Sequence, residues 1–90
     1  MSALNRSVTV VNSRGLHARA AAKFVKLATT FDAEIAVSRN GQTVSGASIM
    51  GLMMLAASPG TELALSASGE QAETALNAIC ELIEAGFEED

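Results

Sequence analysis

Several residue types on which common binding sites depend are scarce in this chain. Its 90 residues include no Trp, no Tyr and only three Phe, so we expect no aromatic platform for stacking nucleic-acid bases. One His and one Cys are too few for a zinc site, and neither a Walker loop nor a dinucleotide-binding glycine motif occurs. A net charge of −4 also disfavours duplex DNA. We therefore expect no metal, no cofactor and no nucleic-acid partner.

Long apolar runs are missing as well. No stretch approaches the roughly 20 residues that cross a membrane, and the opening Met-Ser-Ala-Leu-Asn-Arg lacks the apolar centre of a signal peptide. The single cysteine, Cys80, cannot form an intrachain disulfide, and its place on the apolar side of a predicted helix indicates a buried side chain. We expect a cytoplasmic protein without membrane insertion, folded as one domain over residues 1–90.

Basic residues are absent from the second half of the chain. Residues 46–90 carry eight acids and no Lys or Arg (net −8), whereas residues 1–45 carry six bases and two acids (net +4). Four of the six bases lie between Arg14 and Lys26, on both sides of the only histidine, His17. This placement favours an anionic ligand or an acidic partner near His17, although solvated positions on a helix would account for the same pattern.

Alternating and β-branched segments predict four strands, over residues 4–11, 33–38, 42–44 and 61–68. Asn40-Gly41 is typical of a two-residue type I′ hairpin turn. Ser58-Pro59-Gly60 predicts a further turn. The two strands that flank Asn40-Gly41 must therefore be antiparallel.

Apolar residues at helical spacing predict three helices, over residues 18–31, 48–55 and from 72 onward. Ser48 is placed to cap the second helix, and Ser68-Gly69-Glu70-Gln71 fits a capping box for the third. The first helix carries an apolar face and a second stripe formed by Arg19, Lys23, Lys26 and Thr30. The order βαββαβα, with one apolar face per helix, predicts a two-layer α+β sandwich in which three helices cover one face of a four-stranded antiparallel sheet.

The only histidine stands where a loop meets the first predicted helix. Gly15 allows the turn, and the amides of Ala18 and Arg19 have no acceptors within the helix. These amides and the helix dipole form an anion site. With Arg19 they disfavour the imidazolium, which leaves a neutral ring nitrogen of His17 as a nucleophile, and they would stabilise a phosphoryl group attached to it. A capping or surface histidine without chemistry fits this position equally well.

The segment Gly15-Leu16-His17-Ala18-Arg19-Ala20-Ala21 closely resembles the active-site motif of HPr, the histidine-containing phosphocarrier family of the phosphoenolpyruvate-dependent phosphotransferase system. Ser48-Ile49-Met50-Gly51 is similar to the family's regulatory-serine segment, and the likeness in length and element order covers nearly the whole chain. The resemblance implies an open-faced βαββαβα sandwich. It implies phosphorylation of His17 on Nδ1 by enzyme I, which takes the group from phosphoenolpyruvate.

The resemblance further implies transfer to a histidine of an enzyme IIA-type protein, with Arg19 stabilising the charge. Such a protein is a stoichiometric carrier and not an enzyme. One position departs from the family pattern, because Ala20 stands where proline usually follows the motif arginine. Proline fixes φ in the first turn of a helix, whereas alanine is the best helix former. We expect the helix to survive with a less rigid start.

Large apolar residues crowd the second predicted helix. Leu52 and Leu55 are expected to face the sheet, and the resemblance implies that the other side docks partner proteins. The implied docking residues, including two bases of the first helix, are Ile49, Met50, Met53, Lys23 and Lys26. Methionine suits a surface that must fit several partners. In the alternative interpretation, all the apolar residues of this helix belong to the core.

Ser48 has two interpretations. Serine is favoured as a plain helix cap and needs no further function there. By resemblance it is the site modified by the ATP-dependent HPr kinase/phosphorylase in lineages that have this enzyme. A phosphate at Ser48 would place about two negative charges beside the docking residues, so we expect inhibition of phosphoryl transfer without unfolding.

Two other kinds of protein fit parts of the pattern. A ferredoxin-like small-ligand regulatory domain has a similar α+β composition but does not need a histidine at a helix start. A protein-binding regulator that acts only through the Ser48 surface would not need His17 either. The sequence does not decide whether a phosphoryl relay ends in sugar transport or in a nitrogen-related regulatory branch. A monomer is the expected oligomeric state.

Overall fold

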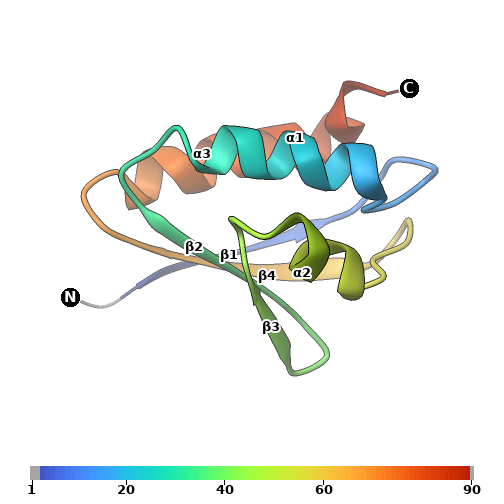
Figure 1. Cartoon of the computed structure of the whole chain (residues 1–90), viewed down its shortest axis with the longest axis horizontal. Helices are drawn as coiled ribbons and strands as arrows, with labels where there is room; N and C mark the ends of the chain where they lie inside the picture. Colours follow the sequence, from blue (N-terminus) through green and yellow to red (C-terminus); the bar gives the residue numbers. More distant parts are fainter. Residues whose placement is uncertain (1–2, 90) are drawn as a thin grey trace.

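The computed structural model describes residues 3–89. Its elements follow the order βαββαβα and end in a short 3-10 helix, labelled η1 (Figure 1). In chain order they are β1 (Leu4–Thr9), α1 (Ala18–Ala28), β2 (Glu34–Arg39), β3 (Gln42–Ser45), α2 (Ile49–Met54), β4 (Glu62–Ser68), α3 (Ala72–Glu84) and η1 (Gly86–Glu88). The predicted α+β class is confirmed. Within residues 3–89, no helix combines the length and the apolar character that a membrane crossing requires.

The four strands form one antiparallel sheet in the order β1-β4-β2-β3. Alternate residues of a strand point to opposite faces of the sheet. Val8 pairs with Leu63 and Val37 with Leu65, and all four side chains are buried, so they share one face. The helices lie over this face and leave the other face open (Figure 1). The expected open-faced sandwich with three helices on one face is therefore confirmed.

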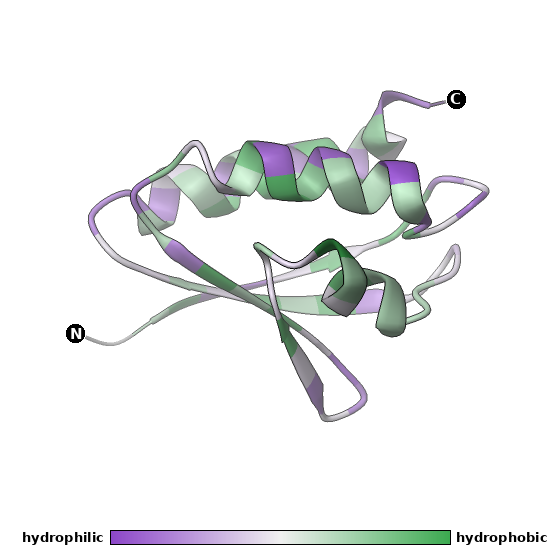
Figure 2. Cartoon of the chain, in the orientation of Figure 1, coloured by the Kyte–Doolittle hydropathy of each residue, from purple (hydrophilic) through white to green (hydrophobic). Residues whose placement is uncertain are grey.

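Helix α1 turns its small and apolar residues to the sheet. Ala20, Ala21, Phe24 and Ala28 are buried, while its outer side is hydrophilic (Figure 2). The small alanines let the helix backbone approach its neighbours closely, and Phe24 fills the core between α1 and the sheet. This side of α1 fixes the direction in which the start of the helix, and therefore His17, faces.

Two elements end two or three residues before their predicted ends, and α2 ends one residue early, at Met54. Strand β1 ends at Thr9 rather than at residue 11, although Val10 still donates to the Thr61 carbonyl and accepts from the Gly60 amide. Helix α1 ends at Ala28 rather than at residue 31, because the Thr29 and Thr30 hydroxyls donate to carbonyls of the last helical turn. Such local side-chain bonds compete with continuation of a helix.

The β2–β3 hairpin turns at Asn40-Gly41, as predicted. Asn40 has φ 50° and Gly41 has φ 80°, which are the two left-handed residues that a type I′ turn needs. This turn sets the β2–β3 register, in which Arg39 pairs with Gln42. The same register places Arg39 at the end of β2, from where its side chain reaches α2.

The predicted capping box before α3 is wrong. Ser68 remains in β4, and Gln71 is the residue before the helix, without a side-chain cap bond. Gln71 instead joins two loops: its Oε1 accepts from the Asp32 amide at 2.6 Å, and its own amide donates to the Asp32 carbonyl at 2.9 Å. Gly69, at φ 116°, redirects the chain before a helix turn can form at Ser68. Local sequence alone could not reveal this pairing with Asp32.

Cys80 on α3 is half-buried rather than buried. Partial burial raises the pKa of its thiol, the Arg6 guanidinium opposes this shift, and Glu84 adds to it. The apolar residues that α3 does bury are Ala72, Ala75, Leu76, Ile79 and Ile83.

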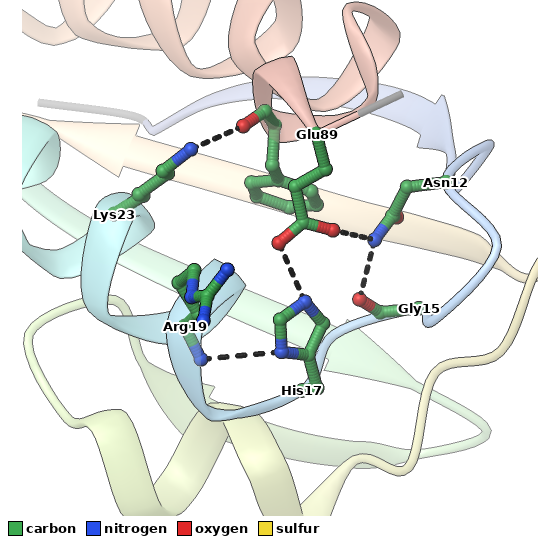
Figure 3. Close-up of polar contacts among 7 residues, drawn as sticks. Asn12, Gly15, His17, Arg19, Lys23 and Glu89 are labelled. Carbon is green, nitrogen blue, oxygen red and sulfur yellow. Dashed lines mark hydrogen bonds and ion pairs between the residues drawn. The ribbon is translucent and has the colours of Figure 1, made fainter.

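The acidic end of the chain does not simply terminate α3. After Glu84 the chain reverses through η1, where Phe87 is completely buried and has φ 56°, and Glu88 has φ 62°. Glu89 then lies beside His17, just before the start of α1 (Figure 3). Phe87 thus anchors this segment in the core, and the residues after it approach His17.

Candidate functional site

His17 is the residue that precedes and caps α1. Its backbone is extended, with φ −79° and ψ −178°, and its Nδ1 accepts from the Arg19 amide at 3.3 Å. The Ala21 amide donates to the His17 carbonyl, which forms the first hydrogen bond of the helix. The Ala18 amide makes no hydrogen bond within residues 3–89. The side chain of His17 is 23% exposed, so a reagent from solution can reach the ring.

Gly15 makes the approach to this helix possible. Its φ is 66°, and a Cβ atom built on it would lie 2.2 Å from the Ala57 carbonyl oxygen. The next residue, Leu16, is buried and donates its amide to that same Ala57 carbonyl at 2.8 Å. The loop before α1 is therefore pressed against the loop after α2. This contact holds His17 beside the second helix.

The second ring nitrogen of His17 contacts the end of the chain. Nε2 lies 2.6 Å from Oε2 of Glu89 (Figure 3). The other carboxylate oxygen of Glu89 accepts from Nδ2 of Asn12 at 3.0 Å, and the same Nδ2 donates to the Gly15 carbonyl at 2.8 Å. Both partners of Nδ2 are acceptors, which fixes the orientation of the Asn12 amide. The network joins residues 72 apart in the sequence.

These partners assign the tautomer of His17. A carboxylate can only accept a hydrogen bond, so Nε2 carries the proton. The Arg19 amide can only donate, so Nδ1 presents its lone pair to it. Of the two ring nitrogens, Nδ1 is therefore the candidate nucleophile, and it lies at the positive end of the α1 dipole.

Glu89 is held as an ionised carboxylate. Desolvation opposes ionisation, but hydrogen bonds from Asn12 and His17, together with the positive charge of Lys23, outweigh it and lower the pKa of Glu89. Lys23 also fixes the backbone of the tail, because its Nζ donates to the Phe87 carbonyl at 2.7 Å (Figure 3). Lys23, expected among the docking residues, is thus engaged by the tail.

A polar hollow of about 460 Å³ is lined by Glu89, the partner of His17, although His17 itself does not line it. Its basic side chains come from the loop before α1 and from α1 itself, and its acidic ones come from the tail: Arg14, Arg19, Lys23, Glu88 and Glu89. The three bases outnumber the two acids, so the hollow has an excess of positive charge, which favours an anionic group. No cluster of potential metal ligands occurs within residues 3–89.

The predicted division of α2 is observed. Leu52 and Leu55 are buried, whereas Ile49, Met50 and Met53 are 40%, 72% and 40% exposed. The interpretation that all these residues belong to the core is wrong. Met54, which is 65% exposed, extends the same surface, and its position four residues after Met50 could have revealed it.

Ser48 caps α2 as predicted, with its Oγ accepting from the Gly51 amide at 2.9 Å. The other end of α2 is capped by a residue that sequence reasoning did not select. Arg39 donates through Nη1 to the Leu55 and Ala56 carbonyls, at 2.7 and 3.0 Å. Lys26 is exposed on α1 and has no side-chain hydrogen bond or ion pair with residues 3–89.

Asn12 and Glu89 are the site residues that the sequence did not indicate. Asn12 is 3% exposed, the one polar side chain among the buried residues of the described chain. An Asn that follows a β-branched strand is an ordinary turn residue, and a Glu in an acidic tail is an ordinary solvated one. Only the fold brings the two together.

A half-buried histidine at a helix start, three bases in a neighbouring hollow and an open-faced βαββαβα sandwich are the features expected of a phosphocarrier. The family model described as PTS HPr component phosphorylation site matches residues 4–85, so the chain belongs to the HPr family of the phosphotransferase system. It is 46% identical over 89 residues to phosphocarrier protein NPr of Shewanella violacea, covering 99% of this chain and 98% of that protein.

A second relative is phosphocarrier protein HPr of Pseudomonas aeruginosa, which is 52% identical over 83 residues, or 91% of this chain and 92% of that protein. Among solved structures, HPr-C-His from Thermoanaerobacter tengcongensis matches with a TM-score of 0.92 and 40% identity, covering 97% of this chain and 98% of that one. The expected family and fold are confirmed, and the ferredoxin-like alternative is set aside.

Proposed function

We propose that Nδ1 of His17 takes a phosphoryl group from phosphorylated enzyme I and passes it to an enzyme IIA-type protein. The observation that carries this proposal is that the two ring nitrogens of His17 have different hydrogen-bond partners. Nε2 carries the proton and contacts the Glu89 carboxylate, whereas the Nδ1 lone pair accepts a hydrogen bond of 3.3 Å from the Arg19 amide at the start of α1. The chain would act as a stoichiometric carrier in the cytoplasm, and we expect it to do so as a monomer.

The transfer follows from this geometry. The Nδ1 lone pair forms the new N–P bond while the bond between phosphorus and the donor nitrogen breaks, and the electron pair of the broken bond stays on the donor. The Arg19 amide, which now donates to Nδ1, becomes available to a phosphoryl oxygen together with the Ala18 amide. The Arg19 guanidinium adds a positive charge at the hollow. Onward transfer is the reverse of these steps.

Partner docking is assigned to the exposed side of α2. Ile49, Met50 and Met53 form an apolar surface on a helix that packs against α1. Flexible methionines can adapt to an enzyme I and to an enzyme IIA-type protein in turn. Lys26 would add a positive charge at the edge of this contact.

Phosphorylation of Ser48 by an HPr kinase/phosphorylase would regulate the carrier. The serine lies beside the apolar docking residues, so its phosphate would oppose partner contact while the amides of α2 stabilise it. A Ser48→Asp variant should stay folded and accept phosphoryl groups more slowly from enzyme I. Transfer at the wild-type rate would contradict this role.

The proposal is tested by incubating the protein with enzyme I and phosphoenolpyruvate. Mass spectrometry should show one added phosphoryl group, which is lost in mild acid. His17→Ala should abolish the modification while leaving the folded circular-dichroism spectrum unchanged. An unmodified wild-type protein, or a modified His17→Ala variant, would overturn the proposal.

A further inference from the structure

We propose that Glu89 is a positioning residue for phosphoryl transfer: it holds the His17 ring with Nδ1 toward the incoming group and balances the charge that the ring gains. This inference rests on the proposed function of His17. It assigns a role in the transfer to Glu89, which lies outside residues 4–85, the part of the chain that matches the family.

The structure builds the position of Glu89 with several independent contacts. Phe87 is completely buried, and the two left-handed residues Phe87 and Glu88 turn the chain back toward α1. Left-handed backbone in residues other than glycine costs on the order of 1 kcal/mol each. Burial of the Phe87 ring and the bond from Lys23 to its carbonyl offset this cost. The side chain of Glu89 is only 11% exposed as a result.

Asn12 orients the carboxylate from the other side. Its Nδ2 donates to Glu89 and to the Gly15 carbonyl. One side-chain amide therefore links the loop before His17 to the C-terminal segment. Oδ1 of Asn12 is buried without a hydrogen-bond partner in the described chain. A buried acceptor without a partner costs about 1–3 kcal/mol. In this orientation Asn12 directs its Nδ2 donor to Glu89, although the unpartnered Oδ1 lowers the stability of the fold.

The chemistry of Nδ1 explains what the carboxylate does. When Nδ1 bonds to phosphorus and Nε2 keeps its proton, the imidazole ring becomes formally positive. The Glu89 carboxylate, 2.6 Å from Nε2, then faces a cation instead of a neutral ring. A hydrogen bond becomes stronger when both of its partners are charged. The contact thus stabilises the loaded form and the transition state more than the empty form.

Glu89 is not the only charge near the ring. The charged groups around the hollow come from the loop before α1, from α1 and from the tail, and α2 carries none: Arg14, Arg19, Lys23, Glu88 and Glu89. The three bases favour the added phosphoryl group and oppose a positive ring. Of the two acids, only Glu89 contacts His17, and the Glu88 side chain forms no hydrogen bond or ion pair with residues 3–89.

The test compares Glu89→Gln and Glu89→Ala with Glu84→Gln, which removes the same charge from an exposed position at the end of α3, outside the hollow. In proton NMR of the unphosphorylated protein, the Nε2 proton of His17 should give a slowly exchanging, hydrogen-bonded signal in the wild type and in Glu84→Gln. The signal should be lost in Glu89→Ala. The amide spectrum reports folding for each variant.

In transfer from phosphorylated enzyme I, Glu89→Ala should lower the rate about tenfold and Glu89→Gln about threefold, since glutamine can still accept from Nε2 but carries no charge. Glu84→Gln should transfer at the wild-type rate. Wild-type rates and an unchanged Nε2 signal in Glu89→Ala would overturn the inference. A wild-type protein that accepts no phosphoryl group would instead overturn the proposed function. The NMR measurement of the Nε2 proton does not depend on phosphoryl transfer, so the two failures can be distinguished.

Discussion

Gly15 and Gly41 both have left-handed backbone angles, with φ of 66° and 80°, but their surroundings differ. A Cβ atom at Gly15 would meet the Ala57 carbonyl oxygen at 2.2 Å, whereas nothing lies within 4 Å of one at Gly41. The two residues therefore separate the effect of backbone strain from the effect of close contact. At Gly15 the contact keeps the loop before His17 against the loop after α2.

Gly15→Ala should therefore destabilise the fold far more than Gly41→Ala. We expect Gly41→Ala to lower the free energy of unfolding by about 1–2 kcal/mol, from backbone strain alone. Gly15→Ala should lower the free energy of unfolding by at least 1 kcal/mol more, on the order of magnitude of other steric clashes, because the loop must also move. Urea unfolding of both variants measures the difference, and equal losses would mean that the close contact at Gly15 has no energetic weight.

At the scale of elements, α2 depends on caps at both ends because six residues are too few for a stable isolated helix. Ser48 caps its start, and Arg39 reaches from β2 to the two carbonyls at its end. The docking residues thus lie on a helix whose end is held by the neighbouring hairpin.

Arg39→Ala should loosen the end of α2. The loss of two hydrogen bonds from a charged donor should destabilise this region by about 1–3 kcal/mol. Amide hydrogen exchange should accelerate at Leu55 and Ala56 first. Lys26→Ala, which removes a base without such bonds, is the matched control. Unchanged exchange in Arg39→Ala would show that the cap is dispensable.

The first turn of α1 contains Ala20 at the position where the family usually has proline. The Ala20 amide has no hydrogen bond within residues 3–89, so a proline there removes none. Ala20→Pro should raise the free energy of unfolding by about 0.4–1 kcal/mol, since it restricts the unfolded chain. Thermal unfolding measures this change, and a lower melting temperature would show that the buried position lacks space for the ring.

At the scale of the whole molecule, Glu89 joins the end of the chain to its beginning. Its pKa is lowered in the folded protein, so its contacts stabilise the fold at pH values above the ordinary pKa of 4.5, and this contribution is lost as the pH falls through the lowered pKa. Wild type should therefore be more stable than Glu89→Gln at about pH 7, and the difference should shrink at about pH 3. Urea midpoints at both pH values test this; a pH-independent difference would exclude an ionic contribution.

Most of the fold could be predicted because each element carries its own periodicity. The Asn40-Gly41 turn, the Ser48 cap and the division of α2 all depend on neighbours within a few residues, and the structure agrees with each. The capping box before α3 is wrong because of a distant contact, since Gln71 forms hydrogen bonds with Asp32 instead. The early end of α1 has a local cause, the Thr29 and Thr30 hydroxyls, which helical periodicity does not reveal.

The site residues also fall into two groups, one placed by local sequence and one placed by distant contacts. His17 and the amides of Ala18 and Arg19 belong to one local motif, and the sequence reveals them. Asn12 and Glu89 complete the site through contacts across 77 residues, and two left-handed residues before Glu89 create the turn that makes this possible. Sequence periodicity contains no signal for such a reversal.

The most direct test of the account is to locate the phosphoryl group on the imidazole. After phosphorylation by enzyme I, nitrogen NMR of protein labelled at histidine should show the N–P bond at Nδ1 of His17, with the proton still on Nε2. A phosphoryl group on Nε2, or on any residue other than His17, would contradict the account.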